Sequence, residues 1–288
     1  MRGTPAEQEH LALQDGIPYH LVTALDEWIE EQLLVETMGG YGLMQRVVNG
    51  DYLRRIELEM QIPLGNDQRV VDRLFQHLRS SNDAYWDLVD YLLRNPLQET
   101  SPSGGIYLSP SERAAKLEEV LYLGRSVWTV RRFGNVHCLE RRADPTVEAS
   151  ATLAMDQGGT AGTHLENAWH LAYGRSRSPG ESYRESVKAV EAAAIPIVLP
   201  NDALATLGKV LGEMRAHPAR WSATVPAAST SMPGTELVIA MMDALWTGQV
   251  GRHGTPNQPA AAQAPEEAEA AVHLAVTLVH WFTSGVVH

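Results

Sequence analysis

The sequence predicts a mainly α-helical protein with a small β-hairpin near its middle. Three observations support this prediction. Apolar residues recur at three- and four-residue spacing along most of the chain, helix-start signals precede several of these stretches, and only residues 126–142 carry a clear strand pattern. We expect an N-terminal helical domain over residues 1–108, a connector of one helix and a hairpin over 109–158, and an antiparallel helical bundle over 159–288.

The composition narrows the class of protein. Of the 288 residues, 44% are hydrophobic and 20% are charged, which is typical of a globular chain. A formal net charge of −12 disfavours a surface that binds nucleic acid over its whole area. The single cysteine, Cys138, is expected to be a small buried side chain and suits a reducing compartment. Because no apolar run of about eighteen residues and no signal-peptide pattern occurs, we expect a cytoplasmic protein without a membrane partner.

Residues 1–108 show helical periodicity. Apolar side chains follow three- and four-residue steps from Tyr19 onward, which predicts one buried helix face. Asn66 and Asn82 are each expected to cap a further helix, since asparagine accepts hydrogen bonds from free N–H groups at helix starts. Pro96 closes the second of these helices, because the residue before a proline avoids the α region. Residues 97–108, rich in proline, serine and glycine, form the expected linker.

Serine and proline mark later helix starts. Residues 109–112 read SPSE, which supplies a serine cap, a proline at the first helical position and a glutamate that completes a capping box. Residues 178–181 repeat this arrangement, and residues 163–166 form a simpler version. These signals place three helix starts along the chain.

A hairpin is expected within residues 126–142, SVWTVRRFGNVHCLERR. β-Branched and aromatic residues flank Gly134 and Asn135, a pair that suits a two-residue hairpin turn. We expect strands near 127–133 and 136–142. No other segment shows so clear a strand pattern.

A modest positive island interrupts the acidic chain. Residues 112–142 hold seven basic side chains against four glutamates. The negative net charge therefore does not exclude a local basic patch here. The basic residues are Arg113, Lys116, Arg125, Arg131, Arg132, Arg141 and Arg142.

From about residue 160 the pattern is that of amphipathic helices joined by short loops, which favours an antiparallel bundle. Trp169, Tyr173 and Trp246 occupy core-type positions, with stacking on RNA bases as the alternative. The expected helices span residues 164–174, 179–195, 202–216, 233–247 and 266–284.

No motif points to a metal or a cofactor. The sequence lacks a phosphate-binding loop, a hydrolase nucleophile elbow and a zinc-peptidase motif. His273 and His280 stand seven residues apart, and two helical turns rise by about 10.5 Å, too far for one metal ion to bridge. We expect both histidines to pack beside the bundle with satisfied ring nitrogens.

Arg252 and His253 form the candidate catalytic pair. The apolar pattern stops after Trp246, and an imidazole then stands beside a permanent cation. Such a histidine could act as acid or base on a phosphodiester while the arginine holds phosphate oxygens. In the alternative, Arg252 only complements the dipole of a helix C-terminus and Gly254 turns the chain.

Four further residues are candidates for ligand binding. Gln249 is expected either to hydrogen-bond a ligand or to belong to a frayed helix end. Gly254 adjoins the catalytic pair. Lys188 and Glu191 lie three residues apart on one helix face, where they either form an exposed ion pair or face a ligand.

The C-terminal half resembles a known family. The segments HLENAWHLAYGR, SYRESVKAVEAAAIPIV, ATLGKVLGEM, RHG and EEAEAAVHLAVTLVHWF follow one another in this order. Over residues 160–284 they resemble the abortive-infection C-terminal domain, which belongs to the HEPN superfamily of helical bundles. The resemblance implies a homodimeric bundle in bacterial antiphage defence, some of whose relatives are metal-independent ribonucleases.

The candidate pair departs from the nuclease pattern of that superfamily. Nuclease members carry an arginine, four to six intervening residues and then a histidine. The corresponding positions here hold Trp246, Thr247 and Gly248, none of which is basic. Arg132 and His137 match the spacing elsewhere, but a hairpin turn between them makes them an ordinary cross-strand pair.

Three functions remain open. The first is a HEPN-like module that binds RNA or a nucleotide without being a fully active nuclease. The second is a metal-independent endoribonuclease that uses His253 and Arg252. The third is a structural or scaffold helical protein of viral or prophage origin, without a ligand.

Overall fold

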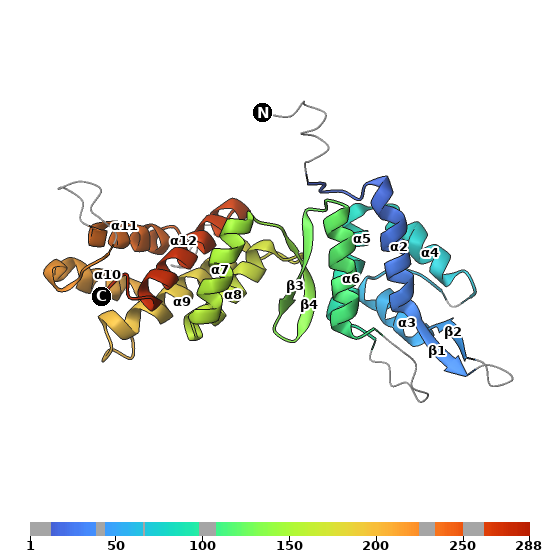
Figure 1. Cartoon of the computed structure of the whole chain (residues 1–288), viewed down its shortest axis with the longest axis horizontal. Coiled ribbons are helices and arrows are strands. Elements are labelled where there is room, and N and C mark those ends of the chain that lie inside the picture. Colours follow the sequence, from blue (N-terminus) through green and yellow to red (C-terminus); the bar gives the residue numbers. More distant parts are fainter. Residues whose placement is uncertain (1–12, 39–43, 66, 98–107, 225–233, 250–261) are drawn as a thin grey trace, which may run out of the picture. The chain divides into compact units, whose positions relative to one another are not determined.

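The protein is mainly α-helical, as predicted, with small antiparallel two-stranded sheets (Figure 1). The chain divides into two compact units, Met1–Arg142 and Ala143–His288. This division falls inside the expected connector over 109–158. The computed structural model describes residues 13–38, 44–65, 67–97, 108–224, 234–249 and 262–288.

The N-terminal unit packs helices against two hairpins. Its core centres on α2, α5 and α6, where Trp28, Leu88 and Leu117 are at most 1% exposed. The described helices are α2 (Tyr19–Leu33), α3 (Gly50–Glu59), α4 (Val70–Leu78), α5 (Asn82–Arg94) and α6 (Pro110–Leu123). The described strands are β1 (Leu34–Met38), β2 (Met44–Val48), β3 (Trp128–Phe133) and β4 (Val136–Arg141).

The β1–β2 hairpin was not expected, so the prediction of a single β segment is wrong. β1 follows α2 without a break, and its register with β2 places Leu34 opposite Val48 and Glu36 opposite Arg46. Glu36 and Arg46 also form an ion pair of 3.7 Å. Each strand has only 5 residues, so its alternation is too short to separate from the helical pattern of α2.

The helix starts confirm one predicted cap and correct another. The Ser109 hydroxyl accepts from the Glu112 N–H (3.3 Å), and the Glu112 carboxylate accepts from the Ser109 N–H (2.7 Å), which is the predicted capping box. Ser81 caps α5 with its hydroxyl, whereas Asn82 is already the first helical residue. Asn66 lies outside the described residues.

The β3–β4 hairpin forms where the sequence predicts it. Its register places Arg132 opposite His137, so this pair is a cross-strand pair as expected. Gly134 adopts a φ of 58°, a left-handed conformation that a residue with a Cβ rarely takes. Cys138 is fully buried, in agreement with its expected role as a small core side chain.

Two carboxylates attach this hairpin to neighbouring helices. Val130 and Leu139 lie opposite each other in the register. The Leu139 N–H donates to Asp90 of α5 (2.7 Å), and the Val130 N–H donates to Glu118 of α6 (2.7 Å). A two-stranded sheet leaves such outward N–H groups without a strand partner, and a buried donor without an acceptor costs about 1–3 kcal/mol. Helical carboxylates therefore take the place of missing strands.

The same carboxylates also hold arginines. Asp90, which is 5% exposed, accepts from Arg94 Nε one turn further along α5 (2.6 Å). Glu118 accepts from Arg142 Nη2 (2.8 Å) and from the Thr129 hydroxyl (2.9 Å). Each carboxylate thus bonds both a backbone N–H and a cation, which compensates for its removal from water.

Three of the seven cations in the positive island of residues 112–142 pair with neighbouring carboxylates. Lys116 pairs with Glu31 (2.6 Å) and Arg141 pairs with Asp15 (2.8 Å), in addition to the Arg142–Glu118 pair. Arg113 is buried and donates to the Leu108 carbonyl (3.0 Å). These contacts reduce the positive charge that the island offers to nucleic acid.

The C-terminal unit is a helical bundle with α8, α9 and α12 at its centre. α9 and α12 contact each other and both contact α8 (Figure 1). Within the described ranges, no helix combines the length and apolar character that a membrane span requires. The helices are α7 (Pro145–Gln157), α8 (Thr160–Tyr173), α9 (Pro179–Val198), α10 (Leu207–Ala216), the short 3-10 helix η2 (Pro218–Arg220), α11 (Gly234–Thr247) and α12 (Pro265–Thr283).

Several predicted boundaries in this unit need correction. α7 was not expected as a helix, and α8 begins at Thr160, so residues 163–166 are internal to the helix. Ser178 precedes α9, but its side chain makes no capping hydrogen bond. α9 continues past Pro196, and α10 begins at Leu207 rather than at 202. Packing against the bundle, rather than the local start signal, decides these ends.

Small side chains let the central helices approach closely. Ala168, Ala189 and Ala275, from α8, α9 and α12, are all 0% exposed. Trp169 is buried among them, and Trp246 is partly buried against the same core, so both confirm the expectation of core positions. Close backbone approach of this kind raises packing density without long side chains.

We expect Asp90→Ala to reduce the free energy of unfolding by about 3 kcal/mol, because it leaves the buried Leu139 N–H without an acceptor and removes the partner of Arg94. Urea denaturation of the full chain measures this loss. Glu30→Gln, at an exposed position of α2, is the control and should change stability by less than about 0.5 kcal/mol. Equal stability of the two variants would contradict the assigned role of Asp90.

Candidate functional site

The structure places only some of the predicted site residues. Arg252, His253 and Gly254 lie outside the described residues. Gln249 is described, and it follows the end of α11 as a half-buried residue. Its position agrees with a helix end and does not by itself indicate a ligand.

The expected ion pair between Lys188 and Glu191 is wrong. Lys188 Nζ instead pairs with Glu185 (2.7 Å). Glu191 Oε1 accepts from the backbone N–H of Leu207 (2.7 Å), which is the first residue of α10. A carboxylate at this place satisfies a free N–H and complements the helix dipole, so Glu191 joins α9 to α10.

The described residues on either side of segment 250–261 are held together. Gln263 is 9% exposed, and its Nε2 donates to the Glu267 carboxylate (2.6 Å) and to the Gly248 carbonyl (3.5 Å). The Glu267 carboxylate also accepts from the Ala264 N–H (3.0 Å) at the start of α12. The chain therefore leaves α11 and enters α12 at one place, which we call the α11–α12 end of the bundle.

Gly248 lies directly against α9. A Cβ atom built on Gly248 would stand 2.3 Å from the hydroxyl oxygen of Tyr183, a buried residue near the start of that helix. A Cβ at this position would require the Tyr183 ring to shift, so the glycine permits α11 to end directly against Tyr183.

A ring cluster joins the end of α8 to the middle of α12. The rings of Trp169 and Tyr173 are 4.5 Å apart, and His273 stacks on Tyr173 at 6.1 Å. Tyr173 Oη and His273 Nε2 are 2.7 Å apart and share a hydrogen bond. One turn before His273, Glu269 pairs with Arg177 of the α8–α9 loop (3.4 Å). The sequence places these residues on buried faces but does not predict that they meet.

The ring cluster holds its imidazole in the neutral form. Burial lowers the pKa of His273, and the nearby Glu269 carboxylate opposes that shift. Burial also raises the pKa of Tyr173 to about 12, so its hydroxyl keeps its proton. A protonated hydroxyl that donates to Nε2 leaves the ring proton on Nδ1. His273 then offers an N–H donor rather than a cation.

His280 corrects the expectation that both histidines have satisfied ring nitrogens. Its Nδ1 is buried and has no hydrogen-bond partner within the described part of the chain. His273, in contrast, bonds to Tyr173 through Nε2. Of these two histidines, His273 is the one whose ring bonds to a polar partner within the described residues.

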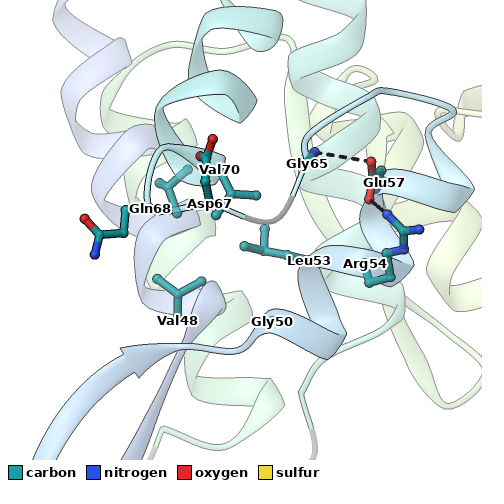
Figure 2. A pocket seen from close by; sticks show the side chains of 10 residues that line it. Val48, Gly50, Leu53, Arg54, Glu57, Gly65, Asp67, Gln68 and Val70 are labelled. Atoms are coloured by element: carbon teal, nitrogen blue, oxygen red, sulfur yellow. Dashed lines mark hydrogen bonds and ion pairs between the residues drawn. The ribbon is translucent and has the colours of Figure 1, made fainter.

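The N-terminal unit contains a large pocket beside α3. Figure 2 shows Val48, Leu53 and Val70 around the hollow, which has a volume of about 970 Å³. Its charged groups are already paired: Arg54 with Glu57, and Asp67 with Arg73 (2.7 Å). The Glu57 carboxylate also accepts from the Gly65 N–H, at 3.4 Å (Figure 2). The remaining lining residues are Gly50, Gln68 and Val71.

A second pocket, of about 570 Å³, lies where α3 begins and α5 ends. Tyr52 and Arg55 stand three residues apart on α3 and line this pocket together. Its other lining residues are Asn49, Asp51, Tyr91, Arg94, Asn95, Pro96 and Leu97. In contrast to the apolar pocket of Figure 2, this one is lined mainly by polar side chains.

Comparison of the chain with models of protein families, with curated proteins and with solved structures gives no match. The resemblance of residues 160–284 to the HEPN superfamily thus remains a prediction from the sequence.

We expect mild acid to destabilise the protein partly through His273. Its folded pKa lies below the value of about 6.5 for the unfolded chain, so the unfolded state takes up a proton first and stability falls as the pH drops below about 6.5. Thermal unfolding at about pH 7.5 and about pH 5.5 measures this loss. The loss should be smaller in His273→Gln, whereas His20→Gln, at an exposed position, should behave like the wild type. An unchanged loss in His273→Gln would refute the contribution of His273.

Proposed function

We propose that residues 159–288 form a HEPN-like module that binds RNA or a nucleotide in bacterial antiphage defence, as a homodimer and without full nuclease activity. The observation that carries this proposal is the contact of Gln263 with Gly248. It brings together the two described ends of the segment that holds Arg252 and His253. The proposal assigns ligand binding to this end of the bundle.

Contacts on four helices support a common location. Gly248 ends α11 against Tyr183 of α9, and Gln263 precedes α12. Further along α12, Glu269 pairs with Arg177, which lies just after the end of α8. His273 bonds to Tyr173, the last residue of α8. Because α8 and α11 end here while α9 and α12 begin here, polar groups from distant parts of the sequence gather at one end of the bundle.

The chemistry at this end suits a phosphate-bearing ligand. The expected N–H donor at His273 Nδ1 can donate to a phosphate or base oxygen. Arg252 would add a permanent cation and two-pronged hydrogen bonds, and His253 an imidazole that can donate or accept a proton. The planar rings of Trp169 and Tyr173 are largely buried, at 7% and 5% exposure, so they support the histidine rather than stack on bases.

We prefer binding over cleavage because none of the three positions where the nuclease pattern places an arginine holds a basic side chain. Trp246 packs on the core, the Thr247 hydroxyl donates to the Asp243 carbonyl (2.7 Å), and Gly248 carries no side chain. The alternative function is a metal-independent endoribonuclease in which His253 transfers the proton and Arg252 stabilises the phosphate. A scaffold without a ligand is the remaining alternative.

The full chain should bind a single-stranded RNA probe with an affinity that falls as salt rises, because bound phosphates release counterions. Fluorescence polarisation over a salt series measures this. We expect Arg252→Ala/His253→Ala to weaken binding about tenfold and to flatten the salt dependence. Arg220→Gln, which removes an exposed cation paired with Glu213 in the same unit, is the matched control and should bind normally.

The same protein separates the alternatives. Cleavage of the RNA in the presence of EDTA, lost in His253→Ala at an unchanged melting temperature, would establish the endoribonuclease instead. Neither binding nor cleavage of any probe would leave only the scaffold function. Equal affinities of Arg252→Ala/His253→Ala and Arg220→Gln would also reject the proposed site.

A further inference from the structure

The polar pocket between α3 and α5 lies in the N-terminal unit, apart from the function proposed above. Its volume of about 570 Å³ lies within the range of small-molecule sites. The start of α3 forms one wall with Asn49 and Asp51, and the end of α5 forms another with Tyr91 and Arg94. Helices that the β3–β4 hairpin and the core hold in place therefore shape this pocket.

Two arginines converge on the pocket. Arg55 is exposed, and it forms no hydrogen bond or ion pair with any residue of the described ranges. Arg94 is held through its Nε by the buried carboxylate of Asp90 (2.6 Å). Asp51 contributes the one carboxylate of the lining, while the charge of Arg94 is compensated by Asp90. Arg55 is therefore the group that offers an uncompensated cation to an anionic ligand.

The tyrosines supply a rigid aromatic wall. The hydroxyl of the buried Tyr52 donates to the Asn95 carbonyl (2.6 Å), which fixes the end of α5 to α3. The half-buried ring of Tyr91 lies 6.4 Å from that of Tyr52. Burial raises the pKa of both tyrosines; Glu59 adds to this rise at Tyr91, and the charge of Arg55 opposes it at both. A cation beside an accessible ring is a common arrangement for a planar, negatively charged ligand.

We propose that this pocket binds a free nucleoside 5′-phosphate. The phosphate contacts Arg55 and Arg94, the base packs on Tyr91, and Asp51 accepts from the ribose hydroxyls. Inorganic phosphate alone would use neither the ring of Tyr91 nor the carboxylate of Asp51. The neighbouring pocket of Figure 2 does not suit an anion, since its arginine is paired with Glu57 and the rest of its lining includes Val48, Leu53 and Val70.

Isothermal titration of the full chain with AMP and with GMP tests the proposal. We expect 1:1 binding of at least one of them, with inorganic phosphate and ribose 5-phosphate binding at least tenfold more weakly. Arg55→Gln should raise Kd at least tenfold. Arg54→Gln is the matched control, because Arg54 is the neighbouring residue of α3 but pairs with Glu57 instead. It should leave Kd within twofold of the wild type.

A second pair of variants isolates the aromatic wall. Tyr91→Phe keeps the ring and should bind within about threefold of the wild type, whereas Tyr91→Leu removes it and should lose at least tenfold in affinity. Thermal melting of each variant, with a midpoint close to that of the wild type, confirms that it is folded. A large loss in Tyr91→Phe, with retained folding, would contradict base stacking.

Other outcomes overturn the proposal directly. These are no binding of either nucleotide at millimolar concentration, equal losses in Arg54→Gln and Arg55→Gln, or phosphate binding as tightly as AMP. Binding of an RNA oligonucleotide but not of AMP, lost in Arg55→Gln, would assign the pocket to RNA instead. Because Arg252→Ala/His253→Ala leaves this pocket intact, AMP binding that disappears only in that variant would place the nucleotide in the C-terminal unit.

Discussion

The buried carboxylate of Asp90 is the contact on which the N-terminal unit most depends. A two-stranded sheet exposes N–H groups along both edges, and burying those groups requires acceptors from elsewhere. Asp90 of α5 accepts a hydrogen bond from the Leu139 N–H, and Glu118 of α6 accepts one from the Val130 N–H. Because Val130 and Leu139 lie opposite each other, a single cross-strand pair fixes the hairpin to two helices. Asp90 also orients Arg94. The carboxylate that completes the sheet edge therefore shapes one wall of the polar pocket as well.

The C-terminal bundle follows a different rule, in which small side chains bring helices close and a few polar contacts fix their ends. Ala168, Ala189 and Ala275 form the central contacts of α8, α9 and α12. The Tyr173–His273 hydrogen bond joins α8 to α12, and burial lowers the pKa of this imidazole. Such a pair links two helices through polar groups inside the bundle.

The sequence predicted elements well where local signals agreed with packing. The Ser109 capping box and the Gly134–Asn135 turn depend on neighbouring residues only, and both occur as expected. The β1–β2 hairpin was missed because strands of 5 residues leave too little alternation. Lys188 and Glu191 show the limit for a candidate site. Spacing alone pairs them, but Glu185 lies closer to Lys188, and the start of α10 offers Glu191 a backbone N–H.

By itself, the sequence determined the helical class, the second hairpin and the resemblance that led to Arg252 and His253. Periodicity, capping and turn residues act over a few neighbours, so they can be recognised in one chain. Only the tertiary structure decided which distant side chains meet: Asp90 with Leu139, Tyr173 with His273, and the residues that converge on the pocket beside Arg55. These contacts join residues far apart in sequence, and no local pattern encodes the geometry that brings them within hydrogen-bonding distance.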